Sequence, residues 1–478
     1  MIHKLVKDPG LPVPNPTKSY WQTPGNERLL NIQSLHLHEK RDVVILGSGI
    51  TGCSVSHWLL KGSDSLTISL MDAREICSGA TGRNGGRINA PAIQNYAKYR
   101  QIFGHHTAVA IVKFELAHFD ALRSVVDEIG PALVHTSEIR QVSAIATAFS
   151  QQKVEELRQM LVDFEQALPE YKGVWRIADE EEIVQKYNIK NAKGAVIGKA
   201  GAVWPYRMVT GIFEALLEQY QDRYALEANT PALGIYRNST SEYAYSVVTA
   251  RGIIQTKHVV HCTEGHTAHL LPMLRGILVP RRGQMTVQNP GSAFPQRGDC
   301  SWNFYLDNMD YATQNPSTGE LFLGGGDVVG YGPALGNPSD AEEAVSALSH
   351  LGGLLPAAFG HETWGTELPG KPRVKASWTG ILCNSLDKVP LVGMLPQEAL
   401  DRPAGSRDSG EWISAGYGGY GMVNAFLCGK AVAMMMLGKD DSYWLPNEYR
   451  LTTTRLHSLY HKLGQVVASE ERHLKALL

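Results

Sequence analysis

Residues 42–60 read DVVILGSGITGCSVSHWLL and join a short apolar run to a glycine-rich turn and an amphipathic segment. The run Val43–Leu46 is apolar throughout, as a strand buried on both faces of a parallel sheet requires. Residues 50–61 place apolar groups at near-helical spacing, and residues 66–71 read as a second strand that stops at Asp72. The order of strand, glycine turn, helix and strand predicts a βαβ unit.

The turn carries the pattern GxGxxG at Gly47, Gly49 and Gly52, directly after the first strand. In this context the first glycine allows a tight turn, the second lets a pyrophosphate approach the backbone, and the third lets helix and strand pack closely. The helix start offers N–H groups and a positive dipole end to phosphates, and the Asp72 carboxylate can accept hydrogen bonds from an adenosine ribose. The segment predicts dinucleotide binding, with an unliganded tight turn as the alternative.

A second glycine-rich stretch, GATGRNGG at residues 79–86, favours a flavin over a nicotinamide dinucleotide. The ribityl chain and ring of a flavin run past a loop at this place, whereas a nicotinamide-binding domain has no need of one. A third cluster, GYGGYGM at residues 416–422, precedes an apolar helical pattern over 423–437, whose dipole could stabilise negative charge on a reduced flavin. All three loops are explained if they face one large cofactor; for residues 79–86 the alternative is a surface turn.

Composition limits the class of protein. A length of 478 residues with 43% hydrophobic and 19% charged residues predicts two or more ordinary globular domains. The formal net charge of −2 offers no basic field for nucleic acid, and neither a signal peptide nor a bilayer-spanning segment is expected. The six cysteines form no CxxC pair, which favours reduced thiols, a cytoplasmic location and no metal site.

Periodicity predicts the remaining elements. Residues 1–40 read as an irregular arm, and residues 441–478 as a helical tail. Apolar spacing predicts helices over 112–129 and 154–168, and an acidic helix start at 179–182. Residues 224–263 are rich in strand patterns, and residues 304–326 predict paired strands around a turn at 315–319.

These motifs, in this order, resemble the D-amino-acid oxidase-like superfamily of FAD-dependent oxidoreductases. The likeness is to the branch of glycine oxidase, sarcosine oxidase and gamma-glutamylputrescine oxidase, especially its fungal members, and covers about residues 40–440. It rests on VVILGSGITG (43–52), SGATGRNGG (78–86), residues 258–285, LFLGGG (321–326), residues 377–393 and AGYGGYGM (415–422).

The resemblance implies an α/β fold in which a Rossmann-type FAD-binding domain is interleaved with an α+β substrate domain on an antiparallel sheet. The FAD-binding part would comprise residues 41–100, 200–285 and 372–440, and the substrate part residues 101–199 and 286–371. It also implies the FAD contacts, which are Gly47, Gly49, Ile50, Thr51, Gly52, Asp72, Ala73, Arg74, Ser78, Gly79, Thr81, Asn84, Gly85, Gly86, Ala232, Gly418, Gly419, Tyr420, Gly421 and Met422. Cys383 aligns poorly with the cysteine that binds flavin covalently in sarcosine oxidase-like proteins, so non-covalent FAD is favoured.

The reaction implied by the resemblance is oxidation of a carbon–nitrogen bond in a small amine or amino-acid-like substrate. Hydride would pass to flavin N5, and oxygen would accept the electrons and give hydrogen peroxide. The expected substrate-site residues are Arg87, Tyr305, Tyr311, Trp378 and Tyr420. Arg87 could hold a carboxylate or a flavin oxygen, with a plain salt bridge as the alternative, and the aromatic residues could equally be packing. Tyr420 stands where many relatives have histidine, which removes a possible titrating group.

The electron acceptor and the substrate stay open at this point. No lysine occurs between Lys257 and Lys371, so that segment cannot supply the lysine that helps some relatives react with oxygen. A dehydrogenase or alcohol oxidase on the same scaffold, and a redox-neutral protein with structural FAD, are therefore the alternatives. A role in secondary metabolism is a further expectation, and the oligomeric state is not predicted.

Overall fold

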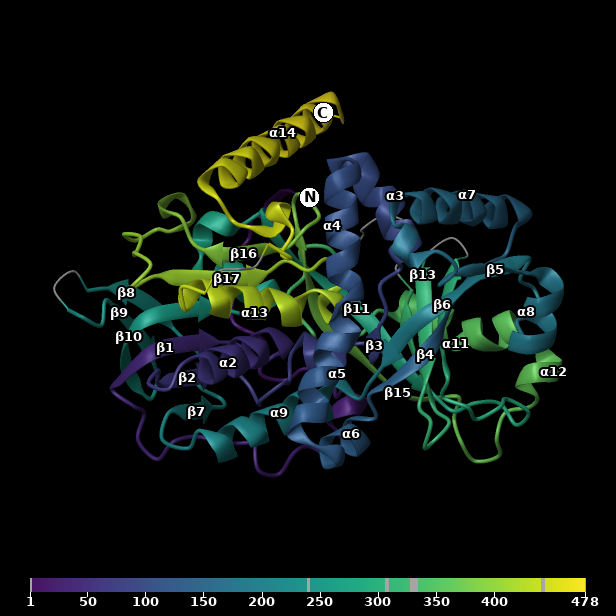
Figure 1. The fold of residues 1–478 in the computed structure, drawn as a ribbon, viewed down its shortest axis with the longest axis horizontal. Helices are drawn as coiled ribbons and strands as arrows, with labels where there is room; N and C mark the ends of the chain where they lie inside the picture. Colours follow the sequence, from purple (N-terminus) through teal and green to yellow (C-terminus); the bar gives the residue numbers. More distant parts are fainter. Residues whose placement is uncertain (1, 239–240, 306–308, 327–333, 440–442, 478) are drawn as a thin grey trace.

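The structure, a computed structural model, describes residues 2–238, 241–305, 309–326, 334–439 and 443–477. Within these residues the chain forms two β-sheets that occupy the two halves of the molecule (Figure 1). The predicted α/β class is therefore confirmed. Residues 306–308, inside the strand pattern predicted over 304–326, lie outside the described residues.

Sheet A contains the Rossmann-type core. Its central strands run parallel in the order β17-β10-β1-β2-β7, with β16 antiparallel at one edge and β8 and β9 added antiparallel beside β10. The strands are β1 (Lys40–Leu46), β2 (Ile68–Met71), β7 (Tyr224–Glu227), β8 (Gly234–Arg237), β9 (Tyr245–Thr249), β10 (Gly252–His261), β16 (Leu391–Met394) and β17 (Glu411–Ala415).

Sheet B is mostly antiparallel, in the order β15-β11-β14-β13-β12-β4-β6-β3 with β5 paired to β6. The exception is the parallel pair of β12 with β4. The strands are β3 (Arg87–Ile88), β4 (Arg140–Ala148), β5 (Arg176–Asp179), β6 (Gly194–Ala202), β11 (Leu278–Gln288), β12 (Cys300–Tyr305), β13 (Met309–Gln314), β14 (Leu321–Gly325) and β15 (Val374–Ser385).

The chain passes repeatedly between the sheets, which confirms the interleaved architecture. Sheet A takes strands from residues 40–71, 224–261 and 391–415, and sheet B from 87–202 and 278–385. The ranges expected for the FAD-binding part contribute strands to both sheets, because β3, β11 and β15 lie in sheet B. The domain boundaries themselves stay a prediction.

Helices cover both sheets. In sheet A's half, α2 and α13 pack against each other, and α13 also contacts β16 and β17. In sheet B's half, α11 packs on β11 and β14. The helices are α1 (Ile2–Leu5), α2 (Ile50–Gly62), α3 (Ala92–Phe103), α4 (His105–Leu116), α5 (His118–Ile129), α6 (Pro131–Ser137), α7 (Gln151–Ala167), α8 (Glu180–Tyr187), α9 (Pro205–Gln219), α10 (Thr267–Leu270), α11 (Val345–Phe359), α12 (His361–Trp364), α13 (Ala425–Met436) and α14 (Thr453–Leu477).

The predicted helix over 112–129 is wrong as a single element, because the chain forms two helices, α4 and α5, with Ala117 between them. The Nδ1 atom of His118 lies 2.9 Å from the Phe114 carbonyl oxygen, which His118's own backbone N–H would otherwise use in a continuous helix. This side-chain bond competes with the helical ladder at that turn. By contrast, the predicted start at 179–182 is confirmed, since the Asp179 carboxylate accepts a hydrogen bond from the Glu182 N–H at 2.9 Å.

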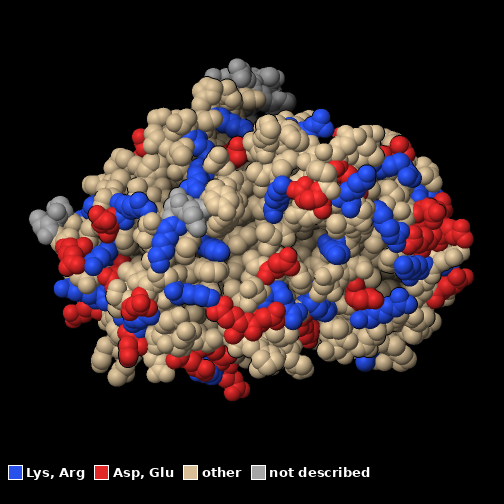
Figure 2. All heavy atoms as spheres, viewed as in Figure 1, with Lys and Arg blue, Asp and Glu red and all other residues tan. Residues whose placement is uncertain are grey.

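Acidic and basic side chains are interspersed over the face shown in Figure 2, without a field of one sign. Among the described residues, no helix combines the length and apolarity needed to cross a bilayer.

Candidate active site

A cavity lies at the carboxyl ends of β1, β2 and β10, where ligands bind in open parallel sheets. It holds about 1340 Å³ of space between atoms, part of it open to solvent. Its wall includes residues 46–51, residues 79–81 with Asn84, and Gly419, Gly421 and Met422, so the three glycine-rich loops converge as the sequence predicts.

The first loop is built as the GxGxxG pattern requires. Gly47 has a φ of +102°, and a Cβ there would lie 2.5 Å from the carbonyl oxygen of Cys262. A Cβ on Gly52 would overlap the carbonyl oxygen of Gly47, so helix α2 can approach β1 only without a side chain at this position. The start of α2 thereby faces the cavity.

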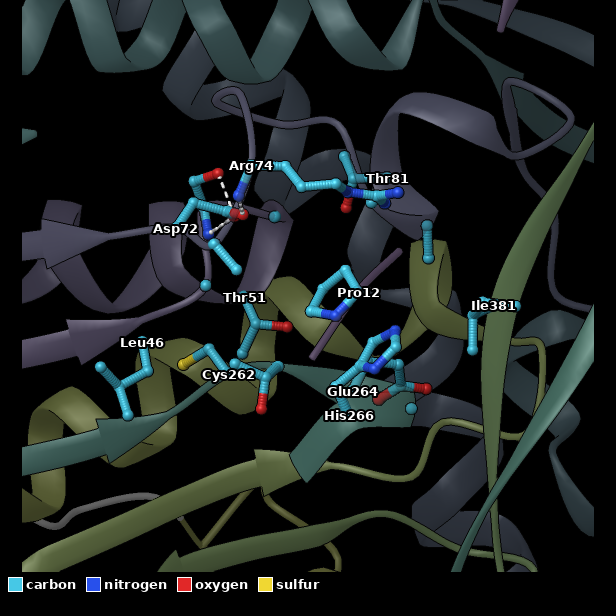
Figure 3. Close-up of a pocket in the computed structure, with 18 of the residues that line it drawn as sticks. Pro12, Leu46, Thr51, Asp72, Arg74, Thr81, Cys262, Glu264, His266 and Ile381 are labelled. Carbon is cyan, nitrogen blue, oxygen red and sulfur yellow. Dashed lines mark hydrogen bonds between the residues drawn. The ribbon is translucent and has the colours of Figure 1, made fainter. Parts of the chain in front are cut away.

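Asp72 lines the cavity at the end of β2, but much of its carboxylate is already engaged (Figure 3). One oxygen accepts hydrogen bonds from the Ser48 N–H at 2.9 Å and from the Ser48 hydroxyl at 2.6 Å. The other accepts from the Arg74 N–H at 3.0 Å. Asp72 therefore first fixes the glycine turn, and only its remaining lone pairs face a ligand.

The second loop is tied to the first through Thr81, whose hydroxyl accepts a hydrogen bond from the Ile50 N–H at 3.0 Å. Of the residues expected to contact FAD, those on the cavity wall are Gly47, Gly49, Ile50, Thr51, Asp72, Ala73, Arg74, Gly79, Thr81, Asn84, Ala232, Gly419, Gly421 and Met422. Those not on the wall are Gly52, Ser78, Gly85, Gly86, Gly418 and Tyr420.

Glu264 positions the third loop, and it was not predicted from the sequence. It follows β10 with a φ of +45°, and it lines the cavity. Its carboxylate accepts hydrogen bonds from the N–H groups of Gly416 at 2.9 Å and Tyr417 at 3.2 Å, and a third from Cys383 N–H at 3.2 Å. Burial raises the pKa of Glu264 to about 7, although these three N–H groups oppose the shift.

Four of the five expected substrate-site residues lie near one another, although none of them is on the cavity wall: Arg87, Tyr305, Tyr311 and Tyr420. The guanidinium carbon of Arg87 lies 4.9 Å from the centre of the Tyr311 ring. The Tyr311 ring packs on Gly85, where a Cβ would lie 2.6 Å from a ring carbon. Tyr420 sits between Gly419 and Gly421, both on the cavity wall. We call this group, with Asn303, the arginine–tyrosine cluster.

Arg87 is a partly buried cation with no acidic partner in the described part of the chain. One terminal nitrogen donates to the Asn303 side-chain oxygen at 2.5 Å, while Nε is buried without a partner. Burial lowers the pKa of Arg87 to about 10, against the opposing effect of the nearby tyrosines, so it stays charged at neutral pH. The plain salt bridge considered for Arg87 is therefore not found among these residues.

Lys98, on α3, is a second cation near this cluster that the sequence analysis missed. Its ammonium lies 5.7 Å from the centre of the Tyr420 ring and 5.3 Å from that of Tyr99. Desolvation lowers the pKa of Lys98, and repulsion from Lys388 adds to this against the attraction of Glu115. No sequence pattern pointed to Lys98, because α3 is remote in sequence from the third loop.

Two other candidates lie away from the cavity wall. Trp378 is fully buried in the core and donates its indole N–H to the Arg83 carbonyl at 2.7 Å. This position favours the alternative considered for Trp378, a role in packing. Cys383 is fully buried in an apolar cluster, and burial raises the pKa of its thiol. Non-covalent FAD stays a prediction, which this position favours.

Comparisons with known proteins agree with this geometry. The bifunctional tRNA 5-methylaminomethyl-2-thiouridine biosynthesis protein MnmC of Burkholderia lata is 24% identical over 84% of this chain. The chain spans only 57% of that protein's length, and 18% of the MnmC of Verminephrobacter eiseniae.

Solved structures share the fold. L-proline dehydrogenase from P. horikoshii superposes with a TM-score of 0.64 at 18% identity, over 87% of this chain and 97% of its own. Glycine oxidase from Geobacillus kaustophilus gives 0.64 at 16% identity, over 87% and 99%. The sequence profile of the DAO family, described as FAD dependent oxidoreductase, matches residues 42–435. The chain belongs to this family, and it is an FAD-dependent oxidoreductase.

Proposed function

We propose that this protein oxidises the carbon–nitrogen bond of an amino acid or a related amine that carries a carboxylate. The observation that carries the proposal is the position of Arg87, a cation without an acidic partner among the described residues. It lies close enough to Tyr420 to interact with it electrostatically, and the sequence neighbours of Tyr420, Gly419 and Gly421, are on the wall of the cofactor cavity. A charged group left in this state is expected to meet a ligand of opposite charge.

FAD fits the cavity on features of this chain. The wall combines glycines, the start of helix α2 and the end of β2 with residues of two further loops, which is the arrangement that binds a dinucleotide in a Rossmann-type sheet. Gly79 leaves the wall open, because no heavy atom lies within 4 Å of where its Cβ would be. We infer that residues 47–51 hold the pyrophosphate and that residues 419–422 lie toward the flavin ring.

The arginine–tyrosine cluster would hold and orient the substrate. The Arg87 guanidinium can pair with a carboxylate through the nitrogens that Asn303 does not occupy. Burial and the neighbouring Tyr420 raise the pKa of Tyr305, so its hydroxyl stays protonated and can donate a hydrogen bond. This arrangement would direct the substrate carboxylate toward Arg87, away from the cavity, and leave the carbon–nitrogen bond facing the cofactor.

The same charges act on the substrate amine. Positive charge from Arg87 and Lys98 disfavours an ammonium group and lowers its pKa, which supplies the neutral amine that oxidation requires. When bound, FAD supplies the hydride acceptor at its N5 atom. Tyr420, in the place where many relatives have histidine, offers an aromatic ring in place of an imidazole.

We propose oxygen as the acceptor, with hydrogen peroxide as the product. Lys98 provides a cation near Tyr420 that the lysine-free segment 258–370 cannot. A dehydrogenase is the second candidate, since one structural relative is named an oxidase and another a dehydrogenase. A cytoplasmic location, a fungal origin and a role in secondary metabolism stay predictions from sequence.

Anaerobic mixing tests the proposal. The yellow FAD-loaded protein would be mixed without oxygen with amino acids, N-alkyl amino acids, and the matching amines that lack only the carboxylate. We expect a carboxylate-bearing compound to remove the yellow absorbance, and air to restore it with release of hydrogen peroxide. Slow recovery in air would indicate a dehydrogenase. Bleaching by alcohols alone, or by no compound, would contradict oxidation of a carbon–nitrogen bond.

A further inference from the structure

The segment Asp8–Val13, which we call the N-terminal strap, crosses the cofactor cavity. Gly10, Leu11 and Pro12 are part of the cavity wall, together with residues more than thirty positions later in the chain. Figure 3 shows the Pro12 ring directed into the cavity beside the ring of His266. The strap therefore adds to the cavity wall a segment that belongs to neither sheet.

One end of the strap is held by the Asp8 carboxylate. It lies 3.0 Å from Nδ1 of His269 and 2.8 Å from a terminal nitrogen of Arg275, and it accepts a hydrogen bond from the Gly10 N–H at 2.8 Å. Burial alone would raise the pKa of Asp8, but the bonds from Gly10 and His269 and the charge of Arg275 lower it. The contacts hold a charged carboxylate at neutral pH, and we call them the Asp8 clamp.

The other end is held by Arg74 and Asp340, both on the cavity wall. Two guanidinium nitrogens of Arg74 donate to the two carboxylate oxygens of Asp340, each at 3.0 Å, and one also donates to the Val13 carbonyl at 3.3 Å. The Thr17 N–H donates to the Asp340 carbonyl at 2.8 Å. The strap is thus fastened on both sides of the residues that cover the cavity.

His266 links the strap to the cavity directly. Its Nδ1 atom lies 3.0 Å from the Gly10 carbonyl oxygen, and since a carbonyl only accepts, Nδ1 must carry the proton. Burial lowers the pKa of His266, and the nearby Arg74 adds to this, so the ring is neutral at pH 7. Its Nε2 atom, which makes no hydrogen bond within the described residues, is left as an acceptor on the cavity wall.

We propose that the N-terminal strap is a cofactor-binding element for the adenosine diphosphate half of FAD. Leu11 and Pro12 cover that half, and His266 Nε2, held in one tautomer by Gly10, accepts a hydrogen bond from a cofactor hydroxyl. FAD leaves the cavity only when the Asp8 clamp opens. This half is specified because Asp72 and Arg74, at the end of the Rossmann-type βαβ unit, share the wall with the strap.

The first test follows the strap itself in the unaltered full-length protein. Amide hydrogen exchange of residues 8–16 would be compared by mass spectrometry with and without saturating FAD. Because bound FAD stabilises only the state in which the strap is closed, exchange of this segment should slow at least tenfold on FAD addition. Equal exchange in the two samples would overturn the proposal.

The second test measures FAD release, from the rise of FAD fluorescence after dilution. Asp8→Ala removes the clamp, and we expect FAD to dissociate about tenfold faster than from the wild type. Lys18→Ala, an exposed position in the same arm outside the clamp, is the matched control and should leave the rate unchanged. An unchanged rate of FAD release from Asp8→Ala, or an equal increase of that rate in both variants, would contradict the proposed role of the strap. Neither test depends on turnover, so the proposal stands or fails independently of the substrate.

Discussion

Replacing Arg87 with methionine should selectively weaken turnover of substrates that carry a carboxylate. Methionine keeps an unbranched chain against the Tyr311 ring but removes the charge. At a separation of about 4 Å and an effective dielectric constant of about 20, a carboxylate and a guanidinium attract each other by about 4 kcal/mol. Desolvation of the incoming carboxylate offsets part of this, leaving a net loss of about 2–4 kcal/mol. That loss corresponds to a roughly 30- to 1000-fold fall in kcat/KM.

The assay compares kcat/KM for an amino acid with that for the amine lacking only its carboxylate. In Arg87→Met the kcat/KM of the amino acid should fall by this full factor. The kcat/KM of the amine should fall much less, because the amine loses only the effect of the Arg87 charge on its own pKa. Arg87→Lys should fall between wild type and Arg87→Met, because it keeps a charge but not the planar fork of donors. Flavin absorbance and the urea unfolding midpoint report whether each variant is folded and loaded. Equal losses for both substrates would show that Arg87 supports the structure and does not bind the carboxylate.

Three other perturbations test separate parts of the account. Glu411→Gln removes the charged partner of the buried His261 and of Arg402, which lie 3.0 Å and 2.5 Å from the carboxylate, although Arg402 keeps its ion pair with Asp401. The free energy of unfolding, measured by urea denaturation, should fall by about 3 kcal/mol. Burial alone would raise the pKa of Glu411, but bonds from His261 and Arg402 lower it from 4.5 to about 2. In the wild type, the contribution of Glu411 to the free energy of unfolding is therefore fully present above pH 4.5 and is lost as the pH falls toward 2. If the free energy of unfolding of Glu411→Gln fell equally steeply over this pH range, the reasoning would be refuted. Gly79→Leu should weaken FAD binding at least tenfold in a fluorescence titration without lowering apoprotein stability, because its side chain enters open cavity space. The control Gly353→Leu, at an exposed position of α11, should not affect FAD binding, and unchanged binding in Gly79→Leu would place the cofactor elsewhere. Glu264→Leu removes the acceptor of three N–H groups, so the third loop should move. This movement should shift the visible spectrum of bound flavin, and an unaltered spectrum would argue against a role of Glu264 in positioning the loop.

Much of the cofactor site could be predicted because it depends on backbone geometry that few residues allow. Neither Gly47, with its positive φ, nor Gly52, packed against the first turn, has space for a side chain. The positions of these glycines in the sequence therefore follow directly from the steric limits of the turn. The βαβ unit followed from local apolar spacing alone. The single helix expected over 112–129 was wrong because one His118 side-chain bond interrupts a pattern that is amphipathic on both sides of it.

The residues that were missed act through contacts between remote segments. Glu264 binds the third loop about 150 positions away, and the strap meets His266 and His269 about 260 positions away. Neither pairing leaves a local spacing that a single sequence can reveal. Arg87 was found because it follows the second glycine loop directly, but its lack of an acidic partner could be seen only once Asn303 and the tyrosines were placed around it.

A single-turnover experiment tests the central claim most directly. The FAD-loaded protein is mixed anaerobically with one equivalent of the amino acid that best removes its yellow absorbance, and the organic product is then quantified. The account predicts one equivalent of imine for each flavin bleached, found either as the imine itself or, after hydrolysis by water, as one equivalent each of carbonyl compound and of ammonia or amine. Bleaching that leaves the substrate carbon–nitrogen bond a single bond, with no imine or carbonyl product, would contradict it.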